Sequence, residues 1–380
     1  MVFIYKMKKI SINFIIFIFL FIIFDLIFSN FIHKEIFKYA CYKYEIDFYS
    51  LRPNCVAYEE QKSSGISFKV YTDDNGYRYL GKKRDKTAKN TVIFLGASHT
   101  YGVGLEYKSS FVGKIEKNIK NYKVLNLAVP SYSPTIYNYQ LKKIIKSKNK
   151  PNKIFLILDI GDIAQESFRW ETKKNSRPNL ITKIPKIKEE KDSGWKRFRR
   201  ENFKGYRIIA YNLRELSRSI RKNFKNQNNI LCDAFSWQFI NNCYTNEVKR
   251  TYWGEFTYTD KNKLQKRYWQ KLSFDESIKK VSKNLSEISL MSKNIDSEFY
   301  IVIFPWAETL EYGQDSFNYE NYAFETCKNI GCTKLINLFP TFREHKNISP
   351  DWRKEFYLVD DIHLNEKGQD LIYKEILKNL

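Results

Sequence analysis

At 380 residues the chain is long enough to bury one large core or two smaller ones. A hydrophobic content of 43% and an aromatic content of 17% exclude an intrinsically disordered protein. The 65 Lys+Arg against 42 Asp+Glu give a net charge of +23, but the basic residues are scattered and form no nucleic-acid-binding motif, so we expect no nucleic-acid partner.

The N-terminus predicts a membrane anchor. Residues 1–9 contain three lysines and precede an apolar run at residues 10–32, which is long enough to cross a hydrocarbon core of roughly 30 Å. No small-x-small cleavage site follows, which favours an uncleaved signal anchor over a removed signal peptide. By the positive-inside rule residues 1–9 are cytoplasmic. We therefore expect a single-pass protein of a bacterial inner membrane with its main domain on the periplasmic side, although Lys34 and Lys38 weaken that orientation.

The chain contains six cysteines, which can indicate whether the protein resides in an oxidising or a reducing compartment. An oxidising compartment permits disulfides, and the close pairs Cys232/Cys243 and Cys327/Cys332 are plausible, with buried free thiols as the alternative. No Cys or His spacing is typical of a zinc site, so no metal is expected.

Residues 33–90 are predicted to be a juxtamembrane segment that leads into the main domain. Within it, residues 66–72 alternate between apolar and polar in the manner of a strand. The sequence DDNG at residues 73–76 predicts a tight turn directly after that strand.

From residue 91 the chain alternates between strand and helix patterns. The predicted strands are short apolar runs, typical of a sheet buried on both faces, at residues 91–95, 124–128, 153–158, 299–304 and 334–338. The predicted helices are one capped by Ser109 with Phe111, Ile115 and Ile119 on one face, one that begins at Ser133-Pro134, and two at residues 317–329 and 366–379. This alternation predicts a parallel sheet with right-handed crossovers over residues 91–380.

Residues 165–295 interrupt the alternation. They are basic, aromatic-rich and prone to form helix, so we expect a long helical insertion that forms a cap or a subdomain. The tryptophans of this segment either fill a small core or stack on sugar rings.

The residues that carry chemistry lie after the strands. Ser98 follows the first strand in the sequence Gly-Ala-Ser, where a strand-to-helix turn exposes its hydroxyl, and His363 precedes the last helix with Asp360 and Asp361 beside it. A hydroxyl nucleophile needs a base, and the base needs an orienting carboxylate. The carboxyl ends of parallel strands meet at one edge of an open sheet, so these loops converge. The sequence therefore predicts a Ser–His–Asp site at that edge.

The order of these blocks resembles the SGNH (GDSL-type) hydrolase superfamily, and in particular a membrane-anchored bacterial branch. The matching blocks are GASHTYG at 96–102, NLAVPSYS at 126–133, DIGD at 159–162 and DDIHLN at 360–365 with Gly368, and segments similar to the bacterial branch are RPN at 52–54, NGYR at 75–78 and FPW at 304–306. The resemblance spans most of residues 50–380 apart from the basic insertion. It implies a flavodoxin-like three-layer α/β/α fold.

By this resemblance Ser98 is the nucleophile and His363 is the general base. The spacing usual in the superfamily assigns the orienting carboxylate to Asp360, whereas the Asp-x-His spacing of some membrane-anchored relatives assigns it to Asp361. Both assignments stay open. A simpler alternative makes Ser98 only a helix N-cap and His363 only a partner for loop atoms.

The chain departs from the family pattern at three positions. Ala97 replaces an Asp that is not the nucleophile. Ser131 stands where the family offers a Gly of the oxyanion hole, and Gly161 stands where it has an Asn, so the expected hole consists of N–H groups of Ser98, Ser131 and Gly161. Losing one donor typically costs about 10²–10³ in rate. Either Asn126, Ser131 or a backbone N–H substitutes, or catalysis is slow.

Three residues are candidates for contact with a substrate: Asn126, Asp162 and Trp306. Asp162 could instead satisfy backbone donors of its loop. Trp306 follows a buried strand and either belongs to the core or forms the wall of an acyl or sugar pocket.

Together these expectations describe a membrane-anchored serine esterase, either an O-acyl (in particular O-acetyl) hydrolase or a transferase, that works through an acyl-enzyme. The expected partners are the membrane, through residues 10–32, and an acylated cell-envelope glycan or small ester, with no cofactor. The rival is a catalytically inactive protein of the same fold that binds glycan or assists envelope assembly, motivated by Gly161. A binder of nucleic acid or anionic lipid is a third alternative, and the oligomeric state is left open.

Overall fold

The chain forms two compact units, one of Met1–Lys38 with Ile184–Cys243 and the other of Tyr39–Lys183 with Tyr244–Leu380. The computed structural model describes residues 13, 15–27, 41–44, 48–61, 64, 66–82, 88–147, 150–172, 178–180, 272–314, 317–359 and 361–380. Several expectations lie outside the described residues: those for residues 1–9, for Asp360, for the pair Cys232/Cys243 and for residues 181–271 of the insertion.

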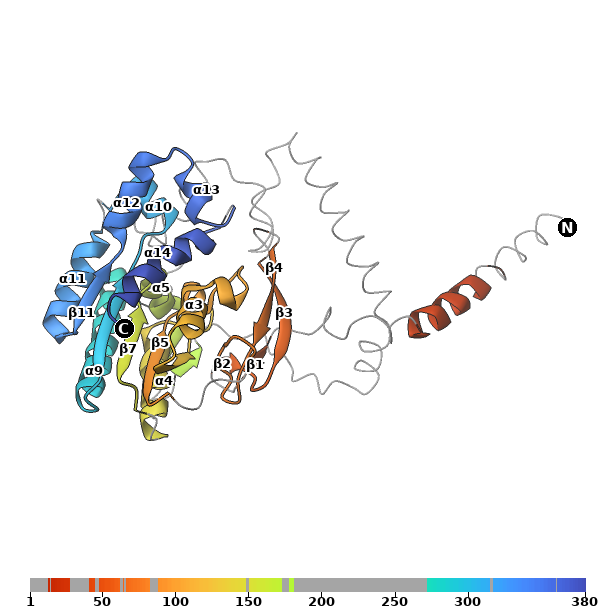
Figure 1. Cartoon of the computed structure of the whole chain (residues 1–380), viewed down its shortest axis with the longest axis horizontal. Coiled ribbons are helices and arrows are strands. Elements are labelled where there is room, and N and C mark those ends of the chain that lie inside the picture. The colour runs from red at the N-terminus through yellow and green to blue at the C-terminus, as the bar shows by residue number, and fades with distance from the viewer. Residues whose placement is uncertain are drawn as a thin grey trace. The chain divides into compact units, whose positions relative to one another are not determined.

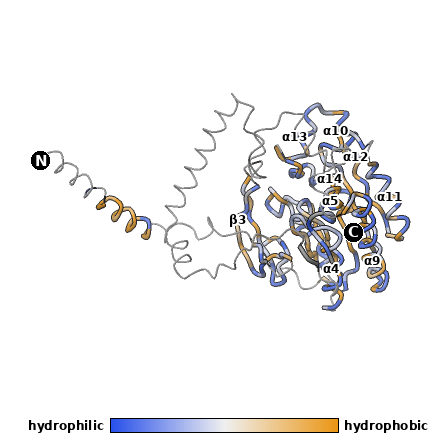
Figure 2. Tube along the Cα trace, turned by 180° about the vertical axis from the view of Figure 1, so that it is seen from behind, coloured by the Kyte–Doolittle hydropathy of each residue, from blue (hydrophilic) through white to orange (hydrophobic). Residues whose placement is uncertain are grey.

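The first unit contributes an apolar helix at residues 13 and 15–27. Most of its residues are apolar (Figure 2), apart from Asn13 and Asp25, and Ile15, Phe17 and Phe19 are each more than 60% exposed. Within the described residues, no helix combines the length and the hydropathy needed to cross a membrane. Residues 10–12, 14 and 28–32 of the expected anchor lie outside that described part.

The second unit is built on a five-stranded sheet. Its strands are β5 (Asn90–Leu95), β6 (Tyr122–Asn126), β7 (Lys153–Ile157), β10 (Glu298–Ile303) and β11 (Lys334–Asn337). All pairings are parallel, and the spatial order is β11-β10-β7-β5-β6. Counted along the chain this is the order 2-1-3-4-5, a doubly wound flavodoxin-like sheet. The predicted parallel sheet is confirmed, and each strand begins and ends within two residues of its expected bounds.

Apolar side chains on both faces explain why these segments form central strands. Phe94, Phe155 and Tyr300 occupy neighbouring positions on β5, β7 and β10. Their rings stack in a row, with centroid distances of 5.4 Å and 4.6 Å between successive rings. Such rows bury large side chains of adjacent strands together and hold their register.

Helices cover the sheet in two layers (Figure 1). In one layer α3 (Phe111–Asn118) packs against α14 (Glu366–Leu377). In the other, α9 (Phe274–Lys293) packs against α4 (Pro134–Lys146), α5 (Gly161–Phe168) and α11 (Tyr319–Ile330). Right-handed crossovers in this strand order require one layer on each face.

The helix α9 changes the expected boundary of the insertion. It lies within residues 165–295, yet it packs on α4 and α5 as part of the outer helical layer. Its N-terminus carries a capping box in which the Ser273 side chain accepts from the N–H of Glu276 and the Glu276 carboxylate accepts from the N–H of Ser273. The fold therefore resumes near residue 272 instead of residue 296.

Two expected helix caps differ in detail. Ser110, not Ser109, caps α3, because its side chain accepts from the N–H of Gly113. Ser133 precedes α4 as expected, but its hydroxyl donates to the buried carboxylate of Glu166 at 2.6 Å and makes no cap bond. Glu166 accepts from the N–H of Thr135 at 2.6 Å instead, so a carboxylate from α5 stabilises the positive end of α4.

Short elements complete the described fold. The described residues contain three antiparallel pairs of short strands. They are β1 (Tyr42–Tyr44) with β2 (Tyr49–Leu51), β3 (Val56–Gln61) with β4 (Ile66–Tyr71), and β8 (Trp170–Thr172) with β9 (Pro178–Leu180). Short helices are α2 (Ser98–Tyr101), η2 (Tyr107–Ser109), α10 (Ala307–Tyr312), α12 (Phe339–Ile348) and α13 (Trp352–Phe356). The turn expected after β4 is present, with Asp73 accepting the N–H of Gly76 at 3.0 Å.

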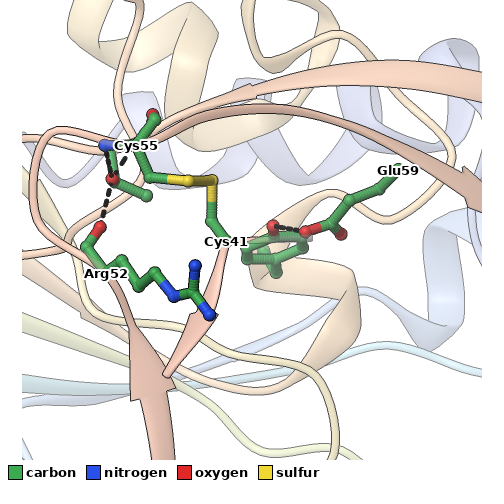
Figure 3. The surroundings of a disulfide bond; sticks show 6 residues. Cys41, Arg52, Cys55 and Glu59 are labelled. Atoms are coloured by element: carbon green, nitrogen blue, oxygen red, sulfur yellow. Dashed lines mark hydrogen bonds between the residues drawn. A yellow bond between two sulfur atoms is a disulfide. The ribbon is translucent and has the colours of Figure 1, made fainter. Parts of the chain in front are cut away.

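Two disulfides lie in the described residues. Cys327 and Cys332 are bonded, with Cα atoms 5.1 Å apart, as the sequence suggested. Cys41 and Cys55 form a second bond, with Cα atoms 5.8 Å apart, that the sequence did not suggest (Figure 3). The sequence offered no reason to pair two cysteines 14 residues apart, because their proximity arises from the β1–β2 pairing.

Candidate active site

Ser98 lies at the start of α2, just beyond the carboxyl end of β5. Gly96 makes the turn possible, because a Cβ at that position would come within 2.1 Å of Thr100 Oγ1. Within residues 92–105 Ser98 alone is not buried. In the described part of the chain its N–H donates to no atom. The turn thus presents both the hydroxyl and the amide of Ser98, as a nucleophile requires.

A buried arginine fixes the other end of this four-residue helix. Arg78 is fully buried and donates to the carbonyls of Tyr101, Gly102 and Leu105, the last two at 2.8 Å and 2.7 Å. Its guanidinium also lies 4.7 Å from the centroid of the Tyr101 ring. The last carbonyls of a helix need donors, and a cation is favoured there. Arg78 therefore holds the helix that carries Ser98.

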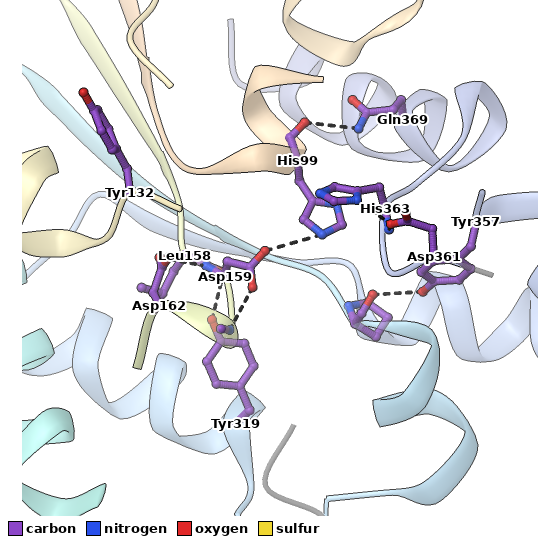
Figure 4. A network of polar contacts seen from close by, with 12 residues as sticks. His99, Tyr132, Leu158, Asp159, Asp162, Tyr319, Tyr357, Asp361, His363 and Gln369 are labelled. Atoms are coloured by element: carbon purple, nitrogen blue, oxygen red, sulfur yellow. Dashed lines mark hydrogen bonds and ion pairs between the residues drawn. The ribbon is translucent and has the colours of Figure 1, made fainter. Parts of the chain in front are cut away.

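His363 and Asp361 form a close pair in the loop between α13 and α14 (Figure 4). Nδ1 of His363 lies 2.5 Å from Oδ1 of Asp361, which also accepts the backbone N–H of His363 at 2.9 Å. An ionised carboxylate only accepts hydrogen bonds, so this network assigns the ring proton to Nδ1. Nε2 is then the basic nitrogen, and within the described residues it has no hydrogen-bond partner. Of the two expected carboxylates, Asp361 contacts His363 in this structure, in agreement with the Asp-x-His spacing. Asp360 lies outside the described residues.

His99 is part of the site, although the sequence pointed only to its neighbour Ser98. Its ring lies 4.7 Å from the ring of Phe304 and 4.9 Å from that of His363, between centroids, and its Nε2 is 3.5 Å from Oδ2 of Asp159. Burial, followed by the charge of His363, lowers the pKa of His99 well below its ordinary value. His99 is therefore a neutral, enclosed imidazole beside the His363–Asp361 pair.

Two carboxyl groups follow β7 and are both buried (Figure 4). Burial raises the pKa of Asp159 to about 6, against the N–H of Gly161, a hydrogen bond from Trp306 and the charge of His363, which lower it. Burial and the neighbouring Asp159 raise the pKa of Asp162 well above its ordinary value. Tyr137 donates to Asp162 at 3.2 Å, and Asp162 accepts the N–H of Asp159 at 3.1 Å. Asp162 thus accepts a backbone N–H of its own loop, as one of the two expectations for it stated, and also the hydroxyl of Tyr137 on α4.

Two of the three expected oxyanion-hole amides are available. Ser131 has the left-handed backbone that favours glycine (φ +63°), and within the described residues its N–H has no acceptor. The N–H of Gly161, by contrast, donates to Oδ1 of Asp159 at 2.8 Å. A Cβ at Gly161 would come within 3.0 Å of the Trp306 ring, so the indole covers this position. The expectation that Gly161 donates to an oxyanion therefore does not hold for this arrangement.

Asn126 and Trp306 occupy the core side of the site. Asn126 is fully buried, donates to the carbonyl of Thr100 at 2.9 Å and accepts the N–H of Ala128 at 3.0 Å. The bond to Thr100 ties β6 to α2, so Asn126 positions the helix that carries Ser98. Trp306 is 4% exposed, belongs to the hydrophobic core, and lies against Gly161 and near His99.

Gln61 is a second contributor that sequence reasoning missed. Its side-chain amide donates to Oδ2 of Asp361. No pattern in residues 56–61 indicates this contact, because it joins segments 300 positions apart. Within the described residues, no group of three or more His, Cys, Asp or Glu side chains is arranged to hold a metal ion.

Comparisons with known proteins add fold-level similarities only. No family model matches the chain, and no curated protein matches its sequence. Among solved structures, TesA is 10% identical with a TM-score of 0.39, over 77% of this chain and 98% of that one. The acetyl xylan esterase AlAXEase is 10% identical (TM-score 0.40; 76% and 99% covered), and a lipolytic G-D-S-L family protein of Veillonella parvula is 13% identical (TM-score 0.40; 76% and 96% covered).

Proposed function

We propose that this chain is a serine esterase of the SGNH type, with Ser98 as nucleophile, His363 as general base and Asp361 as the carboxylate that orients the base. The observation that carries the proposal is the 2.5 Å contact of Asp361 with Nδ1 of His363, which leaves Nε2 without a partner in the described residues. His363 packs against His99, the residue that follows Ser98 in the chain. This contact supports placing the base and the half-buried Ser98 in one site.

The arrangement supports acyl transfer in two steps. Oγ of Ser98 attacks the ester carbonyl and its proton passes to Nε2 of His363, while Asp361 stabilises the imidazolium that forms. The N–H groups of Ser98 and Ser131 are the available donors for the oxyanion. Collapse of the tetrahedral intermediate releases the alcohol, which takes the proton from Nε2 and leaves an ester on Ser98. Water or a sugar hydroxyl then attacks this acyl-enzyme by the reverse sequence.

We further propose that the enzyme is anchored through residues 10–32 in a bacterial inner membrane, with the catalytic unit on the periplasmic side. The apolar side chains of the helix at 15–27 support an anchor, because exposed Phe and Ile along a helix favour a lipid environment. The disulfides Cys41–Cys55 and Cys327–Cys332 support an oxidising compartment.

The proposed substrate is an acylated, in particular acetylated, glycan of the cell envelope, which such an anchor would place within reach. Hydrolysis and transfer use the same residues and differ in whether water or a sugar hydroxyl reaches the acyl-enzyme.

The test is turnover of p-nitrophenyl acetate by the full-length chain in detergent, compared with Ser98→Ala and His363→Gln. The matched control is His345→Gln, the same substitution at a histidine on α12. We expect turnover in the wild type and the control, and its loss by at least about 10³-fold in both site variants. Equal activity in all four proteins would exclude the proposed site.

A second candidate function follows from the Gly161 amide, which is committed to Asp159, and from Trp306, which covers Gly161. A hole with two donors favours a slow enzyme or a protein that binds acylated glycan without turnover. Binding of an acetylated glycan fragment with no turnover in a folded wild-type chain, unaffected by Ser98→Ala, would favour this candidate.

A further inference from the structure

The carboxylate beside His363 is held from both of its oxygens. Oδ1 of Asp361 accepts the backbone N–H of His363 and faces Nδ1 of its ring. Oδ2 accepts a hydrogen bond from the side-chain amide of Gln61. An amide that faces a carboxylate presents its NH₂ group, so Gln61 is a donor here. With both oxygens engaged, the plane of the carboxylate is fixed relative to the imidazole.

Gln61 reaches Asp361 because it is the last residue of β3. Its Cα is paired with that of Ile66, the first residue of β4, so the side chain extends from the end of this hairpin. Gly104 permits the approach, since a Cβ there would lie 2.4 Å from the Leu358 side chain and 3.8 Å from Cβ of Gln61. The hairpin β3–β4 and the loop that carries Asp361 therefore meet over a residue without a side chain.

The same hairpin is attached to the helix that carries Ser98. Tyr101, the last residue of α2, donates its hydroxyl to Glu59 on β3 at 3.0 Å. The N–H of Lys69 on β4 donates to Glu106, in the loop after α2, at 2.9 Å. The hairpin thus contacts the nucleophile side and the base side of the site.

The base of the hairpin is itself secured (Figure 3). Cys55, directly before β3, is bonded to Cys41, and its N–H donates to the Thr72 hydroxyl at 2.9 Å. The Thr72 hydroxyl in turn donates to the carbonyl of Arg52 at 2.5 Å. Together with the contacts of Glu59 and Lys69, these bonds attach the hairpin at its base and along its length, so that it supports Gln61 from several points.

We propose that Gln61 is a positioning residue for the catalytic pair, and that the hairpin β3–β4 is therefore a working part of the active site. By donating to Oδ2 it keeps Oδ1 of Asp361 against Nδ1 of His363. This inference rests on the proposed function for one point, the role of His363 as the general base. Without this donor the carboxylate can turn, and the imidazole loses the contact that stabilises its protonated form.

The test compares two substitutions at Gln61 in the full-length chain. Gln61→Met keeps the length of the side chain and removes the donor, and Gln61→Glu replaces the donor with a second carboxylate. Ser67→Ala, at an exposed position on β4, is the control for a change in the hairpin. We expect kcat for p-nitrophenyl acetate to fall about 10- to 100-fold in Gln61→Met, and further in Gln61→Glu, with KM within about twofold of wild type.

A second readout does not depend on turnover. The proton between Nδ1 of His363 and Asp361 should give a strongly downfield resonance in proton NMR, assigned by its loss in Asp361→Asn. We expect this resonance in the wild type and in Ser67→Ala, and its weakening or upfield shift in both Gln61 variants. A wild-type resonance without any esterase activity would contradict the proposed function and leave this inference standing.

Three outcomes would overturn the inference. The first is wild-type kcat and an unchanged resonance in Gln61→Met and Gln61→Glu. The second is a loss of activity with an unchanged resonance, because the Asp361–His363 pair would then be intact without Gln61. The third is a wild-type chain with no downfield resonance, because Asp361 would then not be held against Nδ1.

Discussion

His99 and His363 pack ring against ring, with centroids 4.9 Å apart and planes inclined by 38°. Because His99 follows Ser98 in the chain, this contact brings the base-bearing loop against the nucleophile-bearing helix. Gln369 on α14 supports it by donating to the carbonyl of His99 at 3.2 Å. A neutral His99 also does not repel the imidazolium that catalysis would form on His363.

The contribution of His99 to the free energy of unfolding should therefore come from the volume of its ring more than from hydrogen bonds of its nitrogens. We expect His99→Phe to keep the contacts with Phe304 and His363 and to change the free energy of unfolding by less than about 1 kcal/mol. His99→Ala should lower it by about 3 kcal/mol, because it leaves a cavity. Urea denaturation of both variants measures the difference. Equal losses in the two variants would show that the imidazole nitrogens, not the ring volume, hold the site together.

The buried Asp159 should make the protein less stable at neutral pH than at acidic pH. Its pKa rises from 3.8 to about 6 in the folded chain, so the folded state disfavours the ionised form. The cost is absent below pH 3.8 and complete above about pH 6. We expect Asp159→Asn to raise the free energy of unfolding by up to about 3 kcal/mol at pH 8 and by almost nothing at pH 4.

Chemical denaturation of the wild type and Asp159→Asn at several pH values measures this difference. Glu298→Gln is the control, because the pKa of Glu298 is shifted in the opposite direction: a hydrogen bond from Tyr300 lowers it, so the ionised carboxylate stabilises the folded state. It should give no gain at pH 8. A gain from Asp159→Asn that does not change with pH would refute the explanation by burial of the charge.

Arg78 should be among the most sensitive positions in the second unit. Arg78→Met leaves the buried carbonyls of Tyr101, Gly102 and Leu105 without their donor, and we expect a loss of about 3–5 kcal/mol. Arg343→Met, which breaks an exposed ion pair with Glu320, should cost less than about 1 kcal/mol. Thermal and urea unfolding compare the two, and similar losses would contradict the role given to Arg78.

Ser131 should be under backbone strain. A non-glycine residue at φ +63° destabilises the folded state by about 1–2 kcal/mol, and glycine removes this strain. Glycine also raises the conformational entropy of the unfolded chain, which offsets about 0.5–1 kcal/mol of the stabilisation. We expect Ser131→Gly to raise the free energy of unfolding by about 0.5–1 kcal/mol, and Ser131→Ala to give no gain because it keeps the Cβ. A destabilised Ser131→Gly would show that the hydroxyl contributes more than the strain costs.

The strands and the outer helices were predictable because their signals are local. The apolar runs at 91–95, 153–158 and 299–304 can be buried on both faces only in the middle of a sheet, and alternation with helices implies parallel order. The departures have non-local causes. The pattern Ser133-Pro134 predicts a helix cap, but the Ser133 hydroxyl donates to Glu166, 33 residues later in the chain.

The sequence by itself determined the class of sheet, the position of Ser98 at a strand end, and the presence of His363 with a nearby acid, because each depends on neighbours in the chain. Only the tertiary structure decided that Asp361 faces Nδ1 of His363, that the Gly161 amide is used by Asp159, and that Gln61 completes the pair. These contacts join segments that no periodicity links. The reason is physical: burial and hydrogen bonding act between whatever groups the fold brings together, regardless of their separation along the chain.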